Sequence, residues 1–303
     1  MSHSHTLSHD HVGDIRPRRS VLYMPAANER ALEKAKTLPA DAIIFDLEDA
    51  VAPDAKEVAR RNAVAAASSG QYGNRELTIR CNGLDTPWGA DDIAAAASSG
   101  ASAVVIPKVN SVAALDQTSA LLDAAGAPSS LMIWAMIETP TAIFDVRAIA
   151  AHPRVSVLVM GTNDLARELR SALGAAGRHP LVPHLAMALA AAREAGIAIL
   201  DGVYNDVKDL EGFQAECVQG AEMGFDGKTL IHPGQVPVAN DVWAPTDDEV
   251  AQARRVIAAF DDGLAQGLGV ITVDGRMIEN LHVANAQRTL AVADAIAALA
   301  SDS

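Results

Sequence analysis

The stretch AIIFDLED, residues 42–49, shows the pattern that decides the fold of this chain: a short apolar run that ends in charged residues. The pattern returns in LTIRCN (77–82), AVVIPK (103–108), LMIWAMIE (131–138), VLVMGTND (157–164), GIAILDG (196–202) and FDGKTLIH (225–232). Runs of this length, bounded by Gly, Pro or polar residues, are typical of parallel strands that are buried on both faces. A further strand is expected at residues 20–25, within RRSVLYMPA.

Ala-rich segments between these runs predict helices that alternate with the strands. The expected helices cover residues 28–38, 54–68, 88–99, 111–124, 140–150, 180–195 and 208–222. Such alternation over about 250 residues is the organisation of an α/β fold of the (β/α)8, or TIM, barrel type, in which all strands point their carboxyl ends to one face. We therefore predict an active site on that face, built from the residues that close the runs: Asp46, Glu48, Asp49, Arg80, Lys108, Glu138, Asp164, Asp201 and His232.

The chain is expected to divide into a tail (1–17), the barrel (18–240) and a C-terminal helical extension (241–303). The tail is rich in histidine and has no apolar periodicity, so we expect it to be disordered. In the extension, TDDEVAQARRVIAAFDDGLAQG (246–267) predicts a helix with a Thr cap and a Glu three residues later, and a last helix is expected from about residue 277 to 300. Because a barrel does not require these helices, we expect them to act as a lid that packs on the barrel or on a neighbouring subunit.

The composition predicts a cytoplasmic enzyme. The chain has 303 residues, 50% of them hydrophobic and 20% charged, which is enough to form a large core. A net charge of −14 argues against a nucleic-acid partner, because phosphate binding requires a basic surface. No apolar run approaches the roughly 20 residues that cross a bilayer. No secretory segment is expected, and the two cysteines, Cys81 and Cys217, are too few for a disulfide framework.

Glu138 and Asp164 indicate a metal site, because they close neighbouring runs. In a barrel their carboxylates are expected side by side, where they repel each other unless a cation lies between them. With no Cys or His nearby in sequence, two carboxylates favour Mg²⁺ or Mn²⁺ over zinc, and leave the remaining positions to water and substrate. The alternative is that each carboxylate caps a helix, one beginning at residues 139–140 and the other at Leu165.

Arg80 closes another run and is expected beside the anion that the metal holds, because its planar fork matches a carboxylate or an enolate. The alternative is an ion pair with an acid of the preceding run: Asp46, Glu48 or Asp49. Both can hold at once. We assign the three acids to orienting Arg80 and the water near the metal.

Several common catalytic motifs are absent from the sequence. There is no G-x-S-x-G elbow, no H-E-x-x-H, no P-loop and no G-x-G-x-x-G between a strand and a helix. Hydrolases, zinc proteases, nucleotide kinases and dinucleotide oxidoreductases are therefore disfavoured. Metal-assisted chemistry on a carbonyl compound remains.

Nine motifs together resemble one known family. They are RSVLYMPA, FDLEDAV followed by Pro-x-x-Lys, IRCNG, IPKV, MIETP, GTNDL, DGVYNDVKDLEGF, GFDGKTLIHPGQV and VDGRMIEN, in this order from about residue 18 to 300. With them the chain resembles the citrate lyase beta-subunit-like (CitE-like) branch of the HpcH/HpaI aldolase superfamily, near the malyl-CoA and citramalyl-CoA lyases. The resemblance implies a TIM barrel, Mg²⁺ and a coenzyme A thioester substrate.

The resemblance also implies roles for individual residues. Glu138 and Asp164 match the Mg²⁺ ligands of the family, and Arg80 matches the group that steadies the oxygen of the enolate or the 2-oxo acid. Asp49 matches the acid that anchors Arg80 and water near the metal. These matches select the metal interpretation of Glu138 and Asp164 over helix capping.

Three further roles follow from the resemblance. Arg19 matches a basic position that meets the coenzyme A phosphates, and Lys34 or Lys36 would assist it. In the family an Asp of the last motif, usually donated by a neighbouring subunit, is the catalytic acid/base; in this chain Glu279 occupies that position. A Glu is one methylene longer, and a shift of about 1 Å in a catalytic group can cost on the order of a hundredfold in rate. Either the lid is repositioned to suit Glu279, or the reaction has changed.

The implied activity is Mg²⁺-dependent cleavage of a carbon–carbon bond. A carboxylated 3-hydroxyacyl-CoA of the malyl-, citramalyl- or citryl-CoA type would give an acyl-CoA and a 2-oxo acid through an enolate. Four alternatives stay open: thioester hydrolysis at the same site, malate-synthase-like condensation, a Schiff-base class I aldolase at Lys108, and a non-catalytic subunit that binds CoA esters. The resemblance implies a homotrimer or a hexamer. From the charge and the lack of a long apolar run we expect no nucleic-acid or membrane partner.

Overall fold

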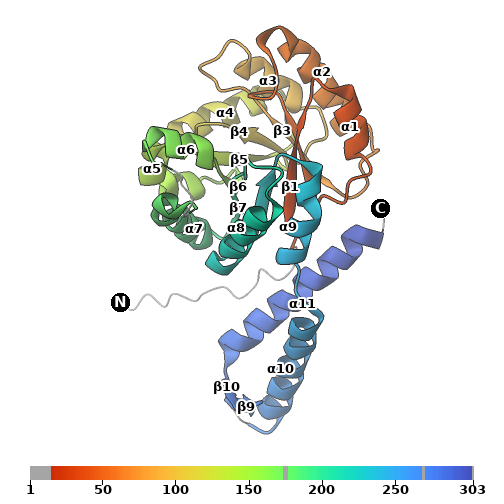
Figure 1. The fold of residues 1–303 in the computed structure, drawn as a ribbon, viewed down its shortest axis with the longest axis vertical. Helices are drawn as coiled ribbons and strands as arrows, with labels where there is room; N and C mark the ends of the chain where they lie inside the picture. Colours follow the sequence, from red (N-terminus) through yellow and green to blue (C-terminus); the bar gives the residue numbers. More distant parts are fainter. Residues whose placement is uncertain (1–14, 173–176, 268–269, 302–303) are drawn as a thin grey trace. The chain divides into compact units, whose positions relative to one another are not determined.

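The apolar runs form a closed barrel of eight parallel strands in the computed structural model, which describes residues 15–172, 177–267 and 270–301 (Figure 1). The strands are β1 (Ser20–Pro25), β2 (Ala42–Asp46), β3 (Glu76–Arg80), β4 (Ala103–Ile106), β5 (Met132–Ile137), β6 (Val155–Met160), β7 (Ala198–Asp201) and β8 (Gly227–Leu230). Each strand pairs in parallel with the next, and β1 closes the ring against β8. The predicted TIM barrel is confirmed.

Helices surround the barrel and return the chain from the end of one strand to the start of the next (Figure 1). They are α1 (Glu29–Ala35), α2 (Lys56–Ser68), α3 (Gly89–Ala96), α4 (Val112–Ala124), α5 (Pro140–Ala150), α6 (Thr162–Glu168), α7 (Val182–Ala195), α8 (Leu210–Met223) and α9 (Val236–Val242). Helix α9 was not expected from the sequence, and a helix near α6 was considered only in the alternative in which Asp164 caps a helix that begins at Leu165. The prediction that a strand runs to Asp164 is wrong, because β6 ends at Met160 and α6 begins two residues later.

Side chains alternate along each strand between the barrel interior and the layer beneath the helices. The interior is filled by Val21, Ala42, Ile44, Ala103, Val105, Trp134, Met136, Val157, Val159 and Leu200. The residues between them pack in the larger core between the strands and the helices. Because the alternation is kept at the strand ends, Tyr23, Asp46, Arg80 and Glu138 continue the interior rows toward the open carboxyl end of the barrel.

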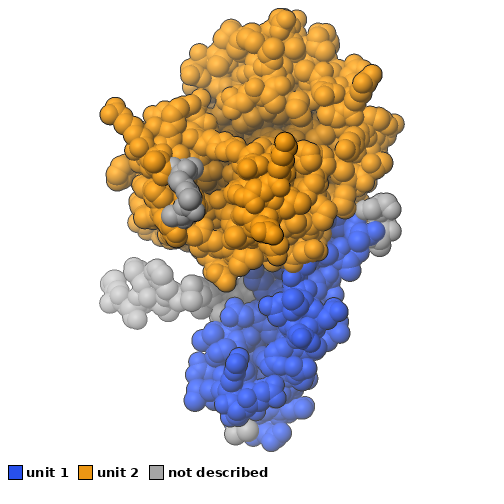
Figure 2. Space-filling model, in the orientation of Figure 1, with its two compact units in different colours: residues 1–17, 244–302 blue, residues 18–243, 303 orange. Residues whose placement is uncertain are grey.

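Residues 244–302 belong to a second compact unit, and residues 18–243 form the barrel unit (Figure 2). The second unit contains α10 (Asp247–Ala265), the antiparallel strands β9 (Ile271–Val273) and β10 (Arg276–Ile278), and α11 (Asn280–Ser301). Thr246 caps α10, and Glu249 completes the predicted capping box. The last helix begins at Asn280 and not near residue 277, because residues 276–278 pair with β9.

Residues 1–14 lie outside the described residues, and with them the histidines on which the disordered tail was predicted. The prediction for the tail therefore stays a prediction. None of the described helices is long and apolar enough to span a membrane.

A buried charge network lies on the outer side of β7 and β8. Asp201 accepts hydrogen bonds from Arg178 Nη1 (2.5 Å) and Lys228 Nζ (2.9 Å), and Lys228 also donates to Glu216 Oε1 on α8 (2.7 Å). The side chains of Asp201 and Lys228 are fully buried. The prediction that Asp201 contributes to the active-site face is wrong, because it follows the interior residue Leu200 and so points outward.

Replacing Lys228 by Met is expected to lower the free energy of unfolding by about 3–5 kcal/mol, because it leaves the buried Asp201 without one of its two cationic partners. The exposed Lys208→Met variant is the control and should change stability by less than about 0.5 kcal/mol. Denaturant unfolding followed by circular dichroism measures both. Equal stability of the two variants would contradict the role given to Lys228.

Candidate active site

A cavity of about 320 Å³ opens among the carboxyl ends of the barrel strands. Its charged lining residues are Asp46, Asp49, Arg80, Glu138 and Asp164, that is, four carboxylates and one guanidinium, with a formal net charge of −3. Neutral polar and apolar groups complete the lining: Tyr23, Pro25, Ala50, Met136, Met160, Gly161, Thr162, Asn163, Val203, Asn205, Thr229 and Ile231. A cavity with this excess of negative charge repels an anionic ligand unless a cation is bound in it.

Arg80 is fixed by a bidentate ion pair with Asp46. Its Nε lies 2.6 Å from Asp46 Oδ1 and its Nη2 lies 2.7 Å from Asp46 Oδ2, while Nη1 lies 2.8 Å from Glu48 Oε2. Asp46 and Arg80 are register partners at the ends of β2 and β3, so both project into the barrel from adjacent strands. Bidentate geometry fixes the plane of the guanidinium as well as its position.

Asp49 has a smaller part in this arrangement than the family resemblance implies. Its side chain is 73% exposed, and its Oδ2 lies 3.6 Å from Arg80 Nη1. The anchoring of Arg80 therefore falls mainly to Asp46, which the sequence analysis named only as one of three acids. Asp49 remains at the rim, where it lines the cavity.

The Arg80 guanidinium also stacks on an aromatic ring of β1. Its central carbon lies 4.7 Å from the ring centre of Tyr23, a cation–π distance. Burial by itself would lower the pKa of Arg80, but the charge and hydrogen bonds of Asp46, together with the charges of Tyr23 and Glu48, outweigh burial and raise the pKa. Burial raises the pKa of Tyr23, so the phenol stays neutral. Arg80 is thus a permanent, oriented cation within an acidic cavity.

Glu138 directly follows β5 and is buried, with 3% of its surface exposed. Its Oε1 accepts a hydrogen bond from the backbone N–H of Lys108 at 2.7 Å, which is the single hydrogen bond to its carboxylate in the described part of the chain. Lys108 has a φ of 49°, in the left-handed region that a residue with a side chain rarely adopts. A locally strained turn after β4 therefore positions this carboxylate.

Gly161 has no side chain, and this makes room for the side chain of Glu138. A Cβ atom at this position would lie 2.3 Å from Glu138 Oε2 and 2.4 Å from its Cβ. Both distances are far shorter than any real contact, so a residue larger than glycine would displace Glu138. Gly161 lines the cavity between β6 and α6.

Asp164 reaches the cavity from the first turn of α6 and not from the end of a strand. Its Oδ1 lies 2.6 Å from Nη2 of the exposed Arg167. Neither carboxylate caps a helix: the Thr139 hydroxyl caps α5, and the residue before α6, Gly161, has no side chain to cap it. The capping alternative considered for Glu138 and Asp164 is therefore not found.

The donor set at this cavity suits a hard divalent cation. Glu138 and Asp164 supply carboxylate oxygens, and no group of three or more His, Cys, Asp or Glu side chains with metal-ligand geometry occurs among the described residues. Two carboxylates with the other positions left to water and ligand oxygens are typical of Mg²⁺. The near-absence of hydrogen-bond donors to the buried Glu138 carboxylate leaves its second oxygen available to such an ion.

The raised pKa of Glu138 shows that its ionised form is unfavourable in this cavity when no metal ion is bound. Burial raises its pKa from 4.5 to about 7, and the charges of Asp164 and Glu48 act in the same direction, against the Lys108 N–H and Arg80. Burial likewise raises the pKa of Glu48 to about 7, although Arg80 lowers it. A bound divalent ion would favour the ionised form of Glu138.

Arg19 does not lie at this cavity. It precedes β1, at the amino end of the barrel, and its guanidinium forms two hydrogen bonds of 2.8 Å with the buried Asp41. This position is at odds with the predicted contact to coenzyme A phosphates, because the cavity is at the opposite ends of the strands. Lys34 is exposed in the last turn of α1, so its predicted contact with coenzyme A stays a prediction.

Two other predicted residues lie outside the cavity lining. The exposed side chain of Lys108 does not line it, and the structure gives no support to a Schiff base there. Glu279 belongs to the second unit, where it follows β10 and its N–H donates to His282 Nδ1 at 3.1 Å. Its role as acid/base stays a prediction.

Replacing Gly161 by Ala is expected to weaken Mg²⁺ binding by roughly 10- to 100-fold, the loss seen when a group that orients a metal ligand is changed. The added Cβ displaces Glu138 while leaving both carboxylates in the chain. Isothermal titration with Mg²⁺ measures the effect, and circular dichroism checks the fold. Unchanged affinity in a folded variant would show that Glu138 does not bind the ion.

Replacing Glu138 by Gln is expected to stabilise the protein in EDTA, and more so as the pH rises. The folded state holds the Glu138 proton up to a pH of about 7, whereas the unfolded state loses it near 4.5, so stability falls with rising pH across this window. Gln keeps the shape of the Glu138 side chain and cannot ionise. The gain in the free energy of unfolding approaches an upper limit of about 3 kcal/mol at pH 8.

Chemical denaturation at pH 5 and pH 8 measures this gain, with the exposed Glu222→Gln variant as control. A difference between Glu138→Gln and wild type that does not change with pH would contradict the raised pKa.

Comparison with known proteins agrees with this fold. A family model described as HpcH/HpaI aldolase/citrate lyase matches residues 19–233. The chain is 51% identical over 282 residues to the (3S)-malyl-CoA thioesterase of Cereibacter sphaeroides, covering 93% of this chain and 96% of that protein. It is 36% identical to the citrate lyase subunit beta of Escherichia coli, covering 92% of this chain and 94% of the subunit.

A solved structure also matches. The CitE protein of Mycobacterium tuberculosis, in complex with magnesium, acetoacetate and coenzyme A, superposes with a TM-score of 0.76 and is 28% identical, covering 92% of this chain and all of that one. The family match extends over most of the barrel, and the relatives match nearly the full length of this chain. The chain belongs to the HpcH/HpaI aldolase/citrate lyase family.

Proposed function

We propose that this protein is a Mg²⁺-dependent enzyme that acts on a carboxylated 3-hydroxyacyl-CoA of the malyl type and hydrolyses its thioester. The observation that carries the proposal is the cavity with Glu138, Asp164 and Arg80, in a chain that is 51% identical to a (3S)-malyl-CoA thioesterase over nearly its full length. The solved CitE structure contains both magnesium and coenzyme A, which supports Mg²⁺ and a CoA ester as the two ligands of this protein.

Glu138 and Asp164 would hold the ion, because they are the carboxylates of the cavity that no buried cation neutralises. When bound, Mg²⁺ would supply the positive charge and the Lewis acidity that a carboxylate and a neighbouring hydroxyl or carbonyl oxygen require. The formal charge of −3 on the cavity lining explains why an anionic substrate needs this ion to enter.

Arg80 would stabilise the negative charge that develops on a substrate oxygen. Asp46 accepts hydrogen bonds from Nε and Nη2, and Glu48 forms an ion pair with Nη1, so the second N–H of Nη2 would be available to a ligand in the cavity. Because Asp46 fixes its plane, the guanidinium does not reorganise as the charge forms. Glu279 would move the proton, as the family resemblance implies.

Carbon–carbon cleavage is the second candidate, because the same cavity suits both reactions and the chain is 36% identical to a citrate lyase subunit. Cleavage and hydrolysis begin alike, with the substrate carboxylate and hydroxyl held beside the ion. They differ in the bond that breaks. Hydrolysis uses water at the thioester carbon, whereas cleavage sends the hydroxyl proton to a base and leaves a thioester enolate.

The decisive assay supplies (3S)-malyl-CoA with Mg²⁺ and scores two products separately. Hydrolysis releases free thiol and malate without glyoxylate, whereas cleavage gives glyoxylate and acetyl-CoA without free thiol. We expect free thiol to form at the higher rate. Glyoxylate without free thiol would reverse the order of the two candidates, and activity that survives EDTA would overturn the metal-dependent proposal.

Variants of the site test the assigned roles in the same assay. Replacing Arg80 by Lys is expected to lower kcat by roughly 100- to 1,000-fold, because an ammonium cannot reproduce the planar fork that faces the developing charge. Glu138→Ala should abolish both activity and Mg²⁺ binding. The exposed Glu222→Gln variant should keep wild-type turnover.

A further inference from the structure

The turn that follows β2, residues 46–50, carries the acids that hold Arg80, and its shape depends on few contacts. The Asp46 carboxylate accepts hydrogen bonds from the N–H groups of Glu48 (2.9 Å) and Ala50 (3.2 Å), which fold the turn back on itself. The Leu47 N–H donates to the Arg80 carbonyl at 3.0 Å. The position of this turn therefore sets the direction from which Asp46 and Glu48 meet Arg80.

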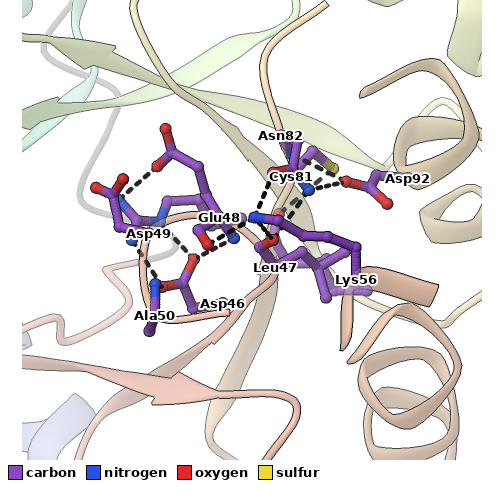
Figure 3. Close-up of polar contacts among 11 residues, drawn as sticks. Asp46, Leu47, Glu48, Asp49, Ala50, Lys56, Cys81, Asn82 and Asp92 are labelled. Carbon is purple, nitrogen blue, oxygen red and sulfur yellow. Dashed lines mark hydrogen bonds and ion pairs between the residues drawn. The ribbon is translucent and has the colours of Figure 1, made fainter. Parts of the chain in front are cut away.

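Lys56, the first residue of α2, binds the backbone of the same turn. Its Nζ donates to the carbonyl oxygens of Leu47 and Glu48, both at 2.8 Å, and to Asn82 Oδ1 at 2.7 Å (Figure 3). An ammonium has three N–H donors, and all three are used. Two consecutive carbonyl groups that converge on one point repel each other, so a cation between them favours this form of the turn.

The charge on Lys56 has no direct anionic partner. The residue is 5% exposed, and no carboxylate in the described part of the chain lies within ion-pair distance of its Nζ. Its nitrogen lies 5.3 Å from the ring centre of Trp88, a cation–π contact. Burial of an ammonium is costly, so a lysine that meets only dipoles and an aromatic ring points to a role beyond stability.

The third partner of Lys56 ties the turn to β3 and α3. Asn82 donates through Nδ2 to the Leu47 carbonyl (2.9 Å) and to Asp92 Oδ2 (2.6 Å), so it contacts Leu47 from a second side (Figure 3). Asp92 is held in turn by Arg60 Nε at 2.6 Å. A continuous network of hydrogen bonds therefore runs from Arg60 of α2 and Asp92 of α3 to the turn beside Arg80.

We propose that Lys56 is a positioning residue, which acts on the reaction through the turn at 46–50 and the Asp46–Arg80 pair. It touches neither the cavity nor the metal ligands, and it fixes the carbonyl groups of Leu47 and Glu48 so that both acids meet Arg80 in one geometry. The effect on kcat rests on the proposed function. The effect on the turn does not.

The test compares wild type with Lys56→Met, which keeps the length and apolar stem of the side chain and removes its donors. We expect kcat for the CoA ester to fall about 100-fold, the loss that follows a displacement of about 1 Å in a catalytic group. KM should change less than threefold. Lys208→Met, at an exposed position outside the cavity lining, is the control and should keep wild-type kcat.

Coupling to Arg80 separates positioning from a general loss of stability. If Lys56 acts through the Asp46–Arg80 pair, Lys56→Met should lower kcat much less in an Arg80→Lys background than in wild type. Multiplicative losses in the double variant would overturn the proposal. So would a kcat of Lys56→Met within threefold of wild type.

Hydrogen exchange of the turn gives a readout that needs no turnover. Lys56→Met should speed the exchange of residues 47–50 at least tenfold and leave the strands β5 and β6 protected as in wild type. Unchanged exchange in the turn, or faster exchange spread over the whole barrel, would overturn the proposal. If Lys56→Met does not fold, Lys56→Gln, which keeps two donors on a shorter stem, takes its place with the same expected result.

The exchange result also separates the two proposals. A wild-type protein that turns over no CoA ester refutes the proposed function, while the exchange of residues 47–50 still decides whether Lys56 fixes the turn. A wild-type protein that is active, with a Lys56 variant normal in both kcat and exchange, refutes only the positioning role.

Discussion

The bidentate ion pair between Asp46 and Arg80 is the interaction on which the active site depends. The two residues are register partners on β2 and β3, and both occupy interior positions, so parallel pairing places a carboxylate and a guanidinium in one plane. Arg80 is nearly buried, and a buried cation without a partner would be strongly destabilising. Asp46 removes that penalty and at the same time gives the cation a direction. The remaining acids of the cavity are then free to serve another cation.

The chemistry of the cavity follows from this division of charge. Glu138 is positioned by backbone features, the N–H of Lys108 and the open space at Gly161, and so keeps its negative charge available. Asp164 enters from a helix and brings a second carboxylate to the same cavity. Neither of these two carboxylates pairs with a buried cation, and a hard divalent ion between them would remove their mutual repulsion.

Membership of the family defines the kind of site but leaves the reaction open, because relatives of this chain bear the names of both a thioesterase and a lyase subunit. Hydrolysis and carbon–carbon cleavage need the same bound substrate and differ in where a proton and a water molecule are admitted. In this chain the last motif carries Glu279 at the position where the family resemblance implies an Asp, and its role as acid/base stays a prediction.

The sequence by itself determined the barrel, because short apolar runs separated by helical segments leave few other ways to bury them. It also brought Arg80 and Glu138 to one cavity, since parallel strands align their carboxyl ends. Asp164 lines the same cavity, but from the first turn of the helix that follows β6. It did not show which way each strand end points. Runs that are buried on both faces show no alternation of apolar and polar residues, so the direction of each side chain cannot be predicted from them. Asp201 was therefore predicted at the site although it faces α8. For the same reason the sequence did not distinguish Asp46, which anchors Arg80, from the exposed Asp49. Only the tertiary structure decided these points, because side-chain direction depends on the register between neighbouring strands and on contacts from residues distant in the chain, as between Asp41 and Arg19 or Lys56 and Asn82.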